Sequence, residues 1–129
     1  MRVWNGTESY PADPAAVVAT AGNYDGVHLG HRAILESTLR DARRRNLRSL
    51  LVTFDPHPLS VVAPERRPRL LQTRRQKLES LEEAGLDEVL ILPFDAAMAA
   101  LSGDQFFDEV LSGPVRLAAV HVGGNFRFG

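Results

Sequence analysis

The sequence predicts an α/β fold in which helices cover both faces of a parallel β-sheet. Short apolar runs alternate along the chain with segments whose apolar residues recur at helical spacing. The apolar runs are continuous and do not alternate with polar residues, which is typical of strands buried on both faces. Strands that alternate with helices in this way are expected to lie parallel and to be joined by right-handed crossovers.

The first half of the chain contains three expected strands and one expected helix. The turn-rich opening holds a short strand at Arg2 to Trp4, and a second strand follows at Ala16 to Ala21. A helix is expected near Gly30 to Arg45, because four apolar residues fall on one face of it: Ile34, Leu35, Leu39 and Ala42. The third strand, Ser49 to Phe54, ends where two prolines forbid regular structure.

The proline- and arginine-rich loop 55–72 leads into a second helix, Thr73 to Ala84. Thr73 with Gln76 predicts a capping box at its start, and Gly85 is typical of a helix end.

Two more strands are expected in the last third of the chain. They are Glu88 to Leu92 and Arg116 to Val122. Between them we expect a short apolar turn or helix at Ala96 to Leu101, followed by a further helix from Ser102 to about Leu111. Ser102 and Gln105 repeat the capping-box pattern at the start of that further helix.

Length and composition predict one soluble domain. The 129 residues suffice for a single core, and the 44% hydrophobic and 24% charged residues are typical of globular domains. No apolar run approaches the ~18 residues of a membrane span, and the N-terminus lacks a leader pattern. We therefore expect a cytoplasmic protein that binds no membrane.

The scarce residue types exclude several classes of site. The absence of cysteine excludes disulfides, zinc–cysteine sites and a thiol nucleophile. Lys77 is the only lysine and lies in a helical pattern, so the chain has no Gly-Lys phosphate loop. It also has no dinucleotide-binding Gly-x-Gly-x-x-Gly motif, and no serine lies in a Gly-x-Ser-x-Gly turn.

Two arginine clusters leave an RNA-binding surface as an alternative. They are Arg43–Arg45 and the group Arg66, Arg67 and Arg69. No aromatic residues alternate with these arginines, and the net charge is −1, so a solvated surface is favoured and no nucleic-acid partner is expected.

Residues 22–31, Gly-Asn-Tyr-Asp-Gly-Val-His-Leu-Gly-His, are the most informative for function. They connect an expected strand to an expected helix, where backbone N–H groups and the helix dipole favour an anion. The glycines let the backbone approach that anion closely, and His28 and His31 are one helical turn apart. We therefore predict a nucleotide-phosphate site. A zinc site that includes Asp25 and a pair of ordinary surface histidines are the alternatives.

Asp25 itself has three possible roles in this turn. It would orient a histidine, cap the helix, or face a hydrated Mg²⁺ ion.

Two further loops are expected at the same edge of the sheet, because ligands bind beyond the carboxyl ends of parallel strands. In Asp55-Pro56-His57-Pro58 the prolines hold Phe54 and His57 as a wall for a flat or anionic ligand. In segment 123–129 two aromatic rings flank Arg127, which suits a ligand with a ring and a phosphate. The alternatives are a plain strand-ending turn at 55–58 and a core strand end at 123–129.

Nucleotidyl transfer fits these residue types better than hydrolysis. A phosphate monoester is largely ionised at neutral pH, since its second pKa is ~6, so it attacks without a general base. It needs alignment with the α-phosphorus and stabilisation of the charge on the pyrophosphate leaving group. Histidines at a helix N-terminus, with Mg²⁺, supply that stabilisation.

These motifs together resemble the FAD synthetase family, the bifunctional riboflavin kinases/FMN adenylyltransferases of prokaryotes. Residues 22–31 resemble the His-x-Gly-His signature of a nucleotidyltransferase superfamily. Residues 52–58, Val-Thr-Phe-Asp-Pro-His-Pro, and 123–129, Gly-Gly-Asn-Phe-Arg-Phe-Gly, are similar to segments of this one family, and so is the run from Leu70 through Phe106. The resemblance covers nearly the whole chain and implies a Rossmann-like sheet.

The resemblance also implies a reaction and a role for each motif residue. FMN and ATP would give FAD and pyrophosphate, with Mg²⁺ held through the ATP phosphates and not by protein ligands. His28 and His31 would be the catalytic residues, on the phosphates. ATP would be bound by Gly22, Asn23, Tyr24, Asp25, Gly26, His28, Gly30 and His31. FMN would be bound by Phe54, Asp55, Pro56, His57, Pro58, Asn125, Phe126, Arg127 and Phe128.

The chain departs from the family pattern in three ways. Tyr24 stands where Phe is usual, and Asn125 stands where Asp is common. The family also continues past Gly129 with a Ser/Thr/Arg-bearing motif and a riboflavin kinase domain. We therefore expect residues 1–129 to be the front part of the adenylyltransferase domain, with the fold but not the full activity. The full-length protein would also phosphorylate riboflavin to FMN.

Two other functions remain as alternatives. One is a different His-x-Gly-His adenylyl- or cytidylyltransferase, and the other is a fragment that binds nucleotide or flavin without catalysis.

Overall fold

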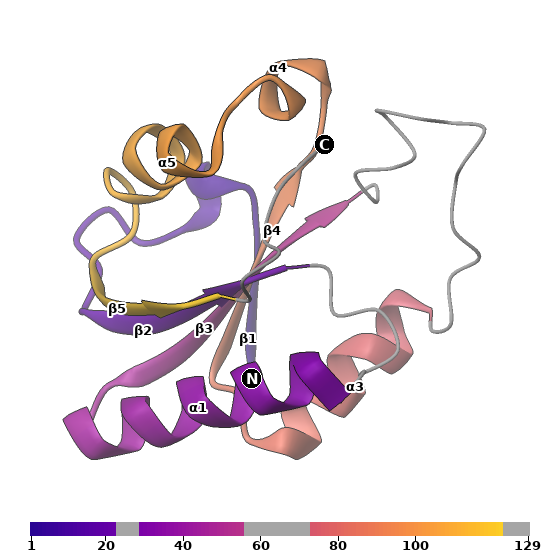
Figure 1. Cartoon of the computed structure of the whole chain (residues 1–129), viewed down its shortest axis with the longest axis vertical. Coiled ribbons are helices and arrows are strands. Elements are labelled where there is room, and N and C mark those ends of the chain that lie inside the picture. The colour runs from indigo at the N-terminus through magenta and orange to yellow at the C-terminus, as the bar shows by residue number, and fades with distance from the viewer. Residues whose placement is uncertain (23–28, 56–72, 123–129) are drawn as a thin grey trace.

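Five parallel strands form a single sheet, in the order β1-β4-β3-β2-β5 (Figure 1). The computed structural model describes residues 1–22, 29–55 and 73–122. The strands are β1 (Arg2–Asn5), β2 (Val17–Ala21), β3 (Arg48–Asp55), β4 (Glu88–Pro93) and β5 (Leu117–His121). All four neighbouring pairs are parallel. The predicted α/β class is confirmed, and the predicted strand bounds hold to within one residue at each end.

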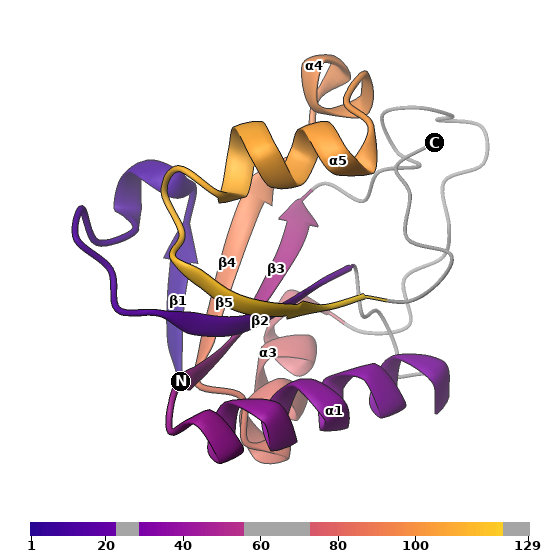
Figure 2. The same ribbon diagram turned by 60° about the vertical axis from the view of Figure 1, so that its left-hand side comes forward.

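Helices lie on both faces of this sheet, as predicted (Figure 2). On one face are α1 (Leu29–Arg45) and α3 (Arg74–Ala84). On the other are α5 (Gly103–Gln105) and its continuation η3 (Phe106–Leu111). The short α4 (Ala96–Ala99) and the 3₁₀ turn η1 (Thr7–Ser9) complete the described elements.

Alternate residues of the central strand β3 supply two separate cores. Leu50, Val52 and Phe54 face α5 and η3, where Phe106 and Leu111 are fully buried. The intervening Leu51 faces α1 and α3 and packs with their leucines: Leu35, Leu39 and Leu81. Both faces of β3 are thus buried from water, which explains its continuous apolar run.

Capping residues set the helix boundaries where the sequence predicted them. The Thr73 hydroxyl accepts the Gln76 N–H at 3.1 Å, and the Gln76 side chain accepts the Thr73 N–H at 3.0 Å. Gly85 ends α3 with φ 100°, a left-handed conformation that favours glycine. Ser102 and Gln105 form the same reciprocal pair before α5.

The helix predicted over 102–111 differs in its second half, which is π-helical. The Ser112 N–H donates to the Phe107 carbonyl five residues back. The wider turn brings residues five apart toward one face, so Phe106 and Leu111 both reach the core. Helical periodicity alone did not indicate this change of winding.

β5 differs from the buried strand that its apolar run predicted. Its residues alternate between half-buried and exposed, and Val120 is 37% exposed. The reason is its place at one end of the described strand order, beside β2 alone.

A polar cluster fixes the amino ends of β3 and β4. Glu88, 5% exposed, accepts hydrogen bonds from the Tyr10 hydroxyl at 3.2 Å and from Arg48 at 3.3 Å. Burial, and then the nearby Glu88 charge, raise the pKa of Tyr10 well above its ordinary value. Asp87 in turn accepts the backbone N–H and the hydroxyl of Ser49.

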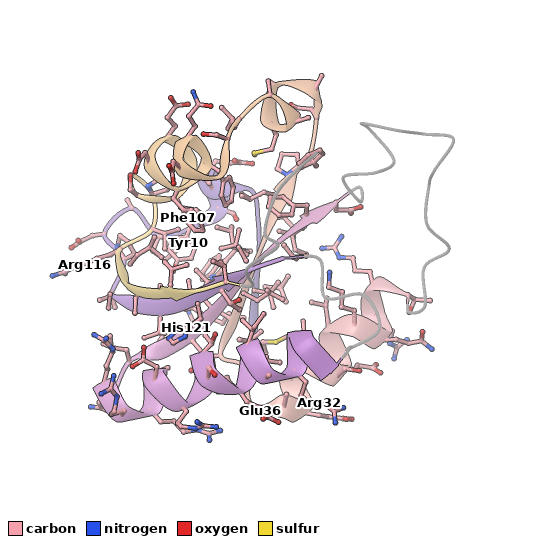
Figure 3. The ribbon with its side chains drawn as sticks, viewed as in Figure 1. Tyr10, Arg32, Glu36, Phe107, Arg116 and His121 are labelled. Atoms are coloured by element: carbon pink, nitrogen blue, oxygen red, sulfur yellow. The ribbon has the colours of Figure 1, made fainter. Side chains whose placement is uncertain are left out.

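Asp41 of α1 holds the carboxyl end of β5 through His121, a residue labelled between the strand and the helix in Figure 3. Its Oδ2 lies 2.8 Å from His121 Nε2, and its Oδ1 accepts from Arg44 at 2.8 Å and Arg45 at 2.9 Å. Hydrogen bonds from Arg44, then His121, then Arg45 hold the pKa of Asp41 well below its ordinary value.

Replacing Phe106 by alanine should lower the free energy of unfolding by about 3–5 kcal/mol, because it empties the centre of a closed core. The neighbouring Phe107 is only partly buried, so Phe107→Ala is the matched control and should cost less. Urea unfolding measures both. Equal losses would contradict the assignment of Phe106 to the core centre.

Replacing Asp41 by asparagine should destabilise the chain at pH 6 and matter less at pH 3. A carboxyl whose pKa is lowered on folding stabilises the fold above its unfolded pKa, and that contribution is lost as the pH falls. Urea midpoints at both pH values measure the difference. Glu79→Gln is the control, because Glu79 pairs only with the exposed Arg75 among described residues and should show little effect. A difference that stays constant between pH 6 and pH 3 would contradict the role of Asp41.

Candidate functional site

Three neighbouring strands present their carboxyl ends at one edge of the sheet. β3, β2 and β5 are adjacent and parallel, so the chain leaves the sheet on the same side after Asp55, Gly22 and Val122. The strand ends therefore lie together, as the expected convergence of the three loops requires. The segments that follow them, 23–28, 56–72 and 123–129, lie outside the described residues.

The N-terminus of α1 belongs to this edge because α1 follows β2 in the chain. The Gly22 N–H donates to the Val52 carbonyl at 3.0 Å and so ties the first motif residue to β3. Gly30 and His31 lie in the first turn of α1, which carries no acidic residue. The 17-residue helix therefore presents the positive end of its dipole without a neutralising carboxylate in its own first turn.

The side chain of Phe54 lies in the core and does not form the expected wall at the rim. It is 6% exposed, and its ring centroid lies 5.6 Å from those of Phe94 and Phe106. Strand alternation explains this, because residue 54 faces the same side as residues 50 and 52. The exposed residue at the end of β3 is Asp55, whose carbonyl accepts the Phe94 N–H.

Lys77, for which the sequence pattern indicates no role, contacts this edge of the sheet. Its Nζ donates to Thr53 Oγ1 at 2.9 Å, and Thr53 is 3% exposed. The signal available in the sequence was a polar residue inside an apolar strand, which needs a polar partner once buried. Nothing in the spacing indicated that the partner would come from the next helix.

The remaining predicted site residues lie outside the described part of the chain, and their roles stay predictions. For ATP these are Asn23, Tyr24, Asp25, Gly26 and His28; for FMN they are Pro56, His57, Pro58, Asn125, Phe126, Arg127 and Phe128.

Two features of the described residues bear on the alternative interpretations. Among residues 1–22, 29–55 and 73–122, no group of three His, Asp or Glu side chains is placed to hold a metal ion. His28 and Asp25 lie outside these residues, so this finding does not test the alternative zinc site. Within the same residues, no helix combines the length and the apolar character that crossing a membrane requires.

A solved structure shares this fold. The crystal structure of a macrolide-efflux protein from Streptococcus pneumoniae superimposes with a TM-score of 0.83 and 21% sequence identity. The match covers 100% of this chain and 50% of that chain. At this identity the likeness shows the fold alone.

Sequence comparisons identify the family. Three curated relatives carry the name bifunctional riboflavin kinase/FMN adenylyltransferase. The one from Escherichia coli K12 is 42% identical over 87% of this chain and 36% of its own length. The one from Pseudomonas fluorescens is 35% identical over 100% of this chain and 41% of its own length. The one from Haemophilus influenzae is 32% identical over 85% of this chain and 36% of its own length.

The chain therefore spans between a third and a half of the length of the curated relatives it matches. The family model for FAD synthetase matches residues 10–129, nearly the whole sequence. The chain belongs to the FAD synthetase family.

Proposed function

We propose that this chain transfers AMP from ATP to FMN, which gives FAD and pyrophosphate. The observation that carries the proposal is the position of the α1 N-terminus, with His31 in its first turn, at the sheet edge where β3 and β5 also end. Membership of the FAD synthetase family supports the choice of FMN and ATP as substrates.

ATP would bind with its phosphates against the start of α1. Backbone N–H groups after Gly22 and in the first helical turn would donate to phosphate oxygens. The imidazoles of His28 and His31 would add hydrogen bonds and, when protonated, positive charge. These donors stabilise the charge that develops on the leaving pyrophosphate.

FMN would bind at the ends of β3 and β5, with its phosphate aligned on the α-phosphorus of ATP. A phosphate oxygen of FMN forms the new P–O bond as the bond to pyrophosphate breaks, and no proton must be removed at neutral pH. Mg²⁺, carried on the ATP phosphates, supplies further charge neutralisation. Asp55 is the FMN-side residue exposed at this edge, and Phe54 supports it from the core.

The proposal extends to the setting of the chain. Because the relatives are longer and are named as bifunctional, residues 1–129 would correspond to part of the adenylyltransferase unit. The complete protein would also phosphorylate riboflavin to FMN and work in the cytoplasm. No nucleic-acid or membrane partner is proposed.

Calorimetry of the chain with Mg-ATP and then with FMN, beside an assay for pyrophosphate release, tests the function. Both ligands should bind, and pyrophosphate should appear only when both are present, at a rate below that of the full-length protein. Release with a different acceptor would favour another nucleotidyltransferase, and binding without release would favour a non-catalytic module. Binding of RNA that weakens steeply with salt, without nucleotide binding, would favour the arginine surface.

Replacing His28 and His31 together by alanine should lower turnover by roughly 10²–10³-fold, because the developing pyrophosphate charge loses its donors. The dissociation constant for FMN should change far less, since the proposed flavin contacts lie elsewhere. Arg40→Ala, an exposed change on the same helix, is the control for altered α1 stability. The comparison is made in the full-length protein, where comparable turnover in the double variant and the wild type would overturn the assigned roles.

A further inference from the structure

The ammonium group of Lys77 lies at the same edge of the sheet as the proposed site. α3 ends at Ala84, just before the amino end of β4, so it begins toward the carboxyl edge. The hydrogen bond from Arg74, its first residue, to Asn5 at the carboxyl end of β1 supports this orientation, at 2.8 Å. Lys77 stands in the first turn and a half of that helix.

The partner of Lys77 is the last buried polar side chain of β3. Thr53 lies two residues before the end of the strand, next to the point where Gly22 leaves β2. Its hydroxyl faces α3 and accepts the Lys77 ammonium at 2.9 Å. A hydrogen bond with a charged donor is about twice as strong as a neutral one.

The end of β3 is therefore held from both faces of the sheet. On one face the ring of Phe54 packs between Phe94 and Phe106. On the other face Thr53 is held by Lys77. The next residue, Asp55, is exposed at the strand end and belongs to the proposed flavin side.

The attachment of α3 to the sheet has other sources. Leu81, 1% exposed, anchors the helix in its core, and Thr73 and Gly85 cap its ends. The Lys77–Thr53 hydrogen bond adds a polar contact between this helix and the end of β3.

We infer that Lys77 is a positioning residue for flavin binding, which acts through Thr53 to fix the carboxyl end of β3. The inference rests on the proposed function, because it assigns the end of β3 to FMN and the β2–α1 connection to ATP. It predicts a selective effect: loss of the Lys77–Thr53 hydrogen bond, called the tether below, weakens FMN binding and leaves ATP binding nearly unchanged. A loss of general stability would weaken both.

The test uses four variants of the 129-residue chain. Lys77→Met removes the charge and keeps the length, Lys77→Arg keeps a charged donor, and Thr53→Val removes the acceptor at nearly constant volume. Arg75→Met is the matched control, because Arg75 lies on the same helix, is 89% exposed and pairs with Glu79. Calorimetry gives the dissociation constants for FMN and for Mg-ATP, and amide hydrogen exchange reports on the strand.

Lys77→Met and Thr53→Val should each raise the dissociation constant for FMN by roughly tenfold and that for Mg-ATP by less than about twofold. The double variant should weaken FMN binding by less than the two single effects combined, because both changes remove the same hydrogen bond. Lys77→Arg should recover part of the loss. Amides at 53–55 should exchange faster in Lys77→Met, while those of β2 and all those of Arg75→Met keep the wild-type rate.

Equal weakening of FMN and Mg-ATP, or unchanged FMN affinity in Lys77→Met, would overturn the inference while wild-type binding and pyrophosphate release still support the proposed function. A wild-type chain that binds neither ligand would overturn the proposed function, and with it the flavin role of Lys77. In that case the exchange rates alone show whether the tether holds the strand end.

Discussion

The parallel pairing of β2 with β3 decides where every part of the candidate site begins. It places Val52 opposite Ala21, so Gly22 leaves the sheet beside Thr53 and can donate its N–H to the Val52 carbonyl. A slip of one residue would turn Thr53 into the aromatic core and Phe54 toward Lys77. Both the phosphate side and the flavin side of the proposed site thus depend on one register.

The amino and carboxyl edges of the sheet carry different charged and polar groups. At the amino edge, the carboxylates accept hydrogen bonds: Glu88 from Arg48 and Tyr10, and Asp87 from Ser49. At the carboxyl edge, α1 presents its positive end, and Lys77 contributes a cation on the same face of the sheet. The positive end of α1 and the Lys77 ammonium are thus at the edge of the proposed site, while the contacts of the other edge fix the strands.

Much of the fold could be predicted because each signal was local. Apolar runs gave the strands, and Thr73, Gly85 and Ser102 marked helix ends through chemistry that acts within a few residues. The features that could not be predicted depend on distant partners. Lys77 hydrogen-bonds to Thr53, which is 24 positions away in the sequence, and His121 hydrogen-bonds to Asp41, which is 80 positions away. Phe54 was expected at the rim because the proline-rich turn 55–58 follows it directly. Strand alternation instead directs its ring to the core.

The π-helical winding of η3 depends on the number of residues between Phe106 and Leu111. A π turn accommodates more residues than an α turn, and here it lets Phe106 and Leu111 share one core. Removing one residue between them would leave the two side chains four positions apart, a spacing that ordinary α-helical winding places on one face. The shorter segment would then lose its π turn while both side chains stay in the core. Homologous chains that keep this core should therefore differ in length here by one residue, with an α-helix in the shorter form and a π turn in the longer one.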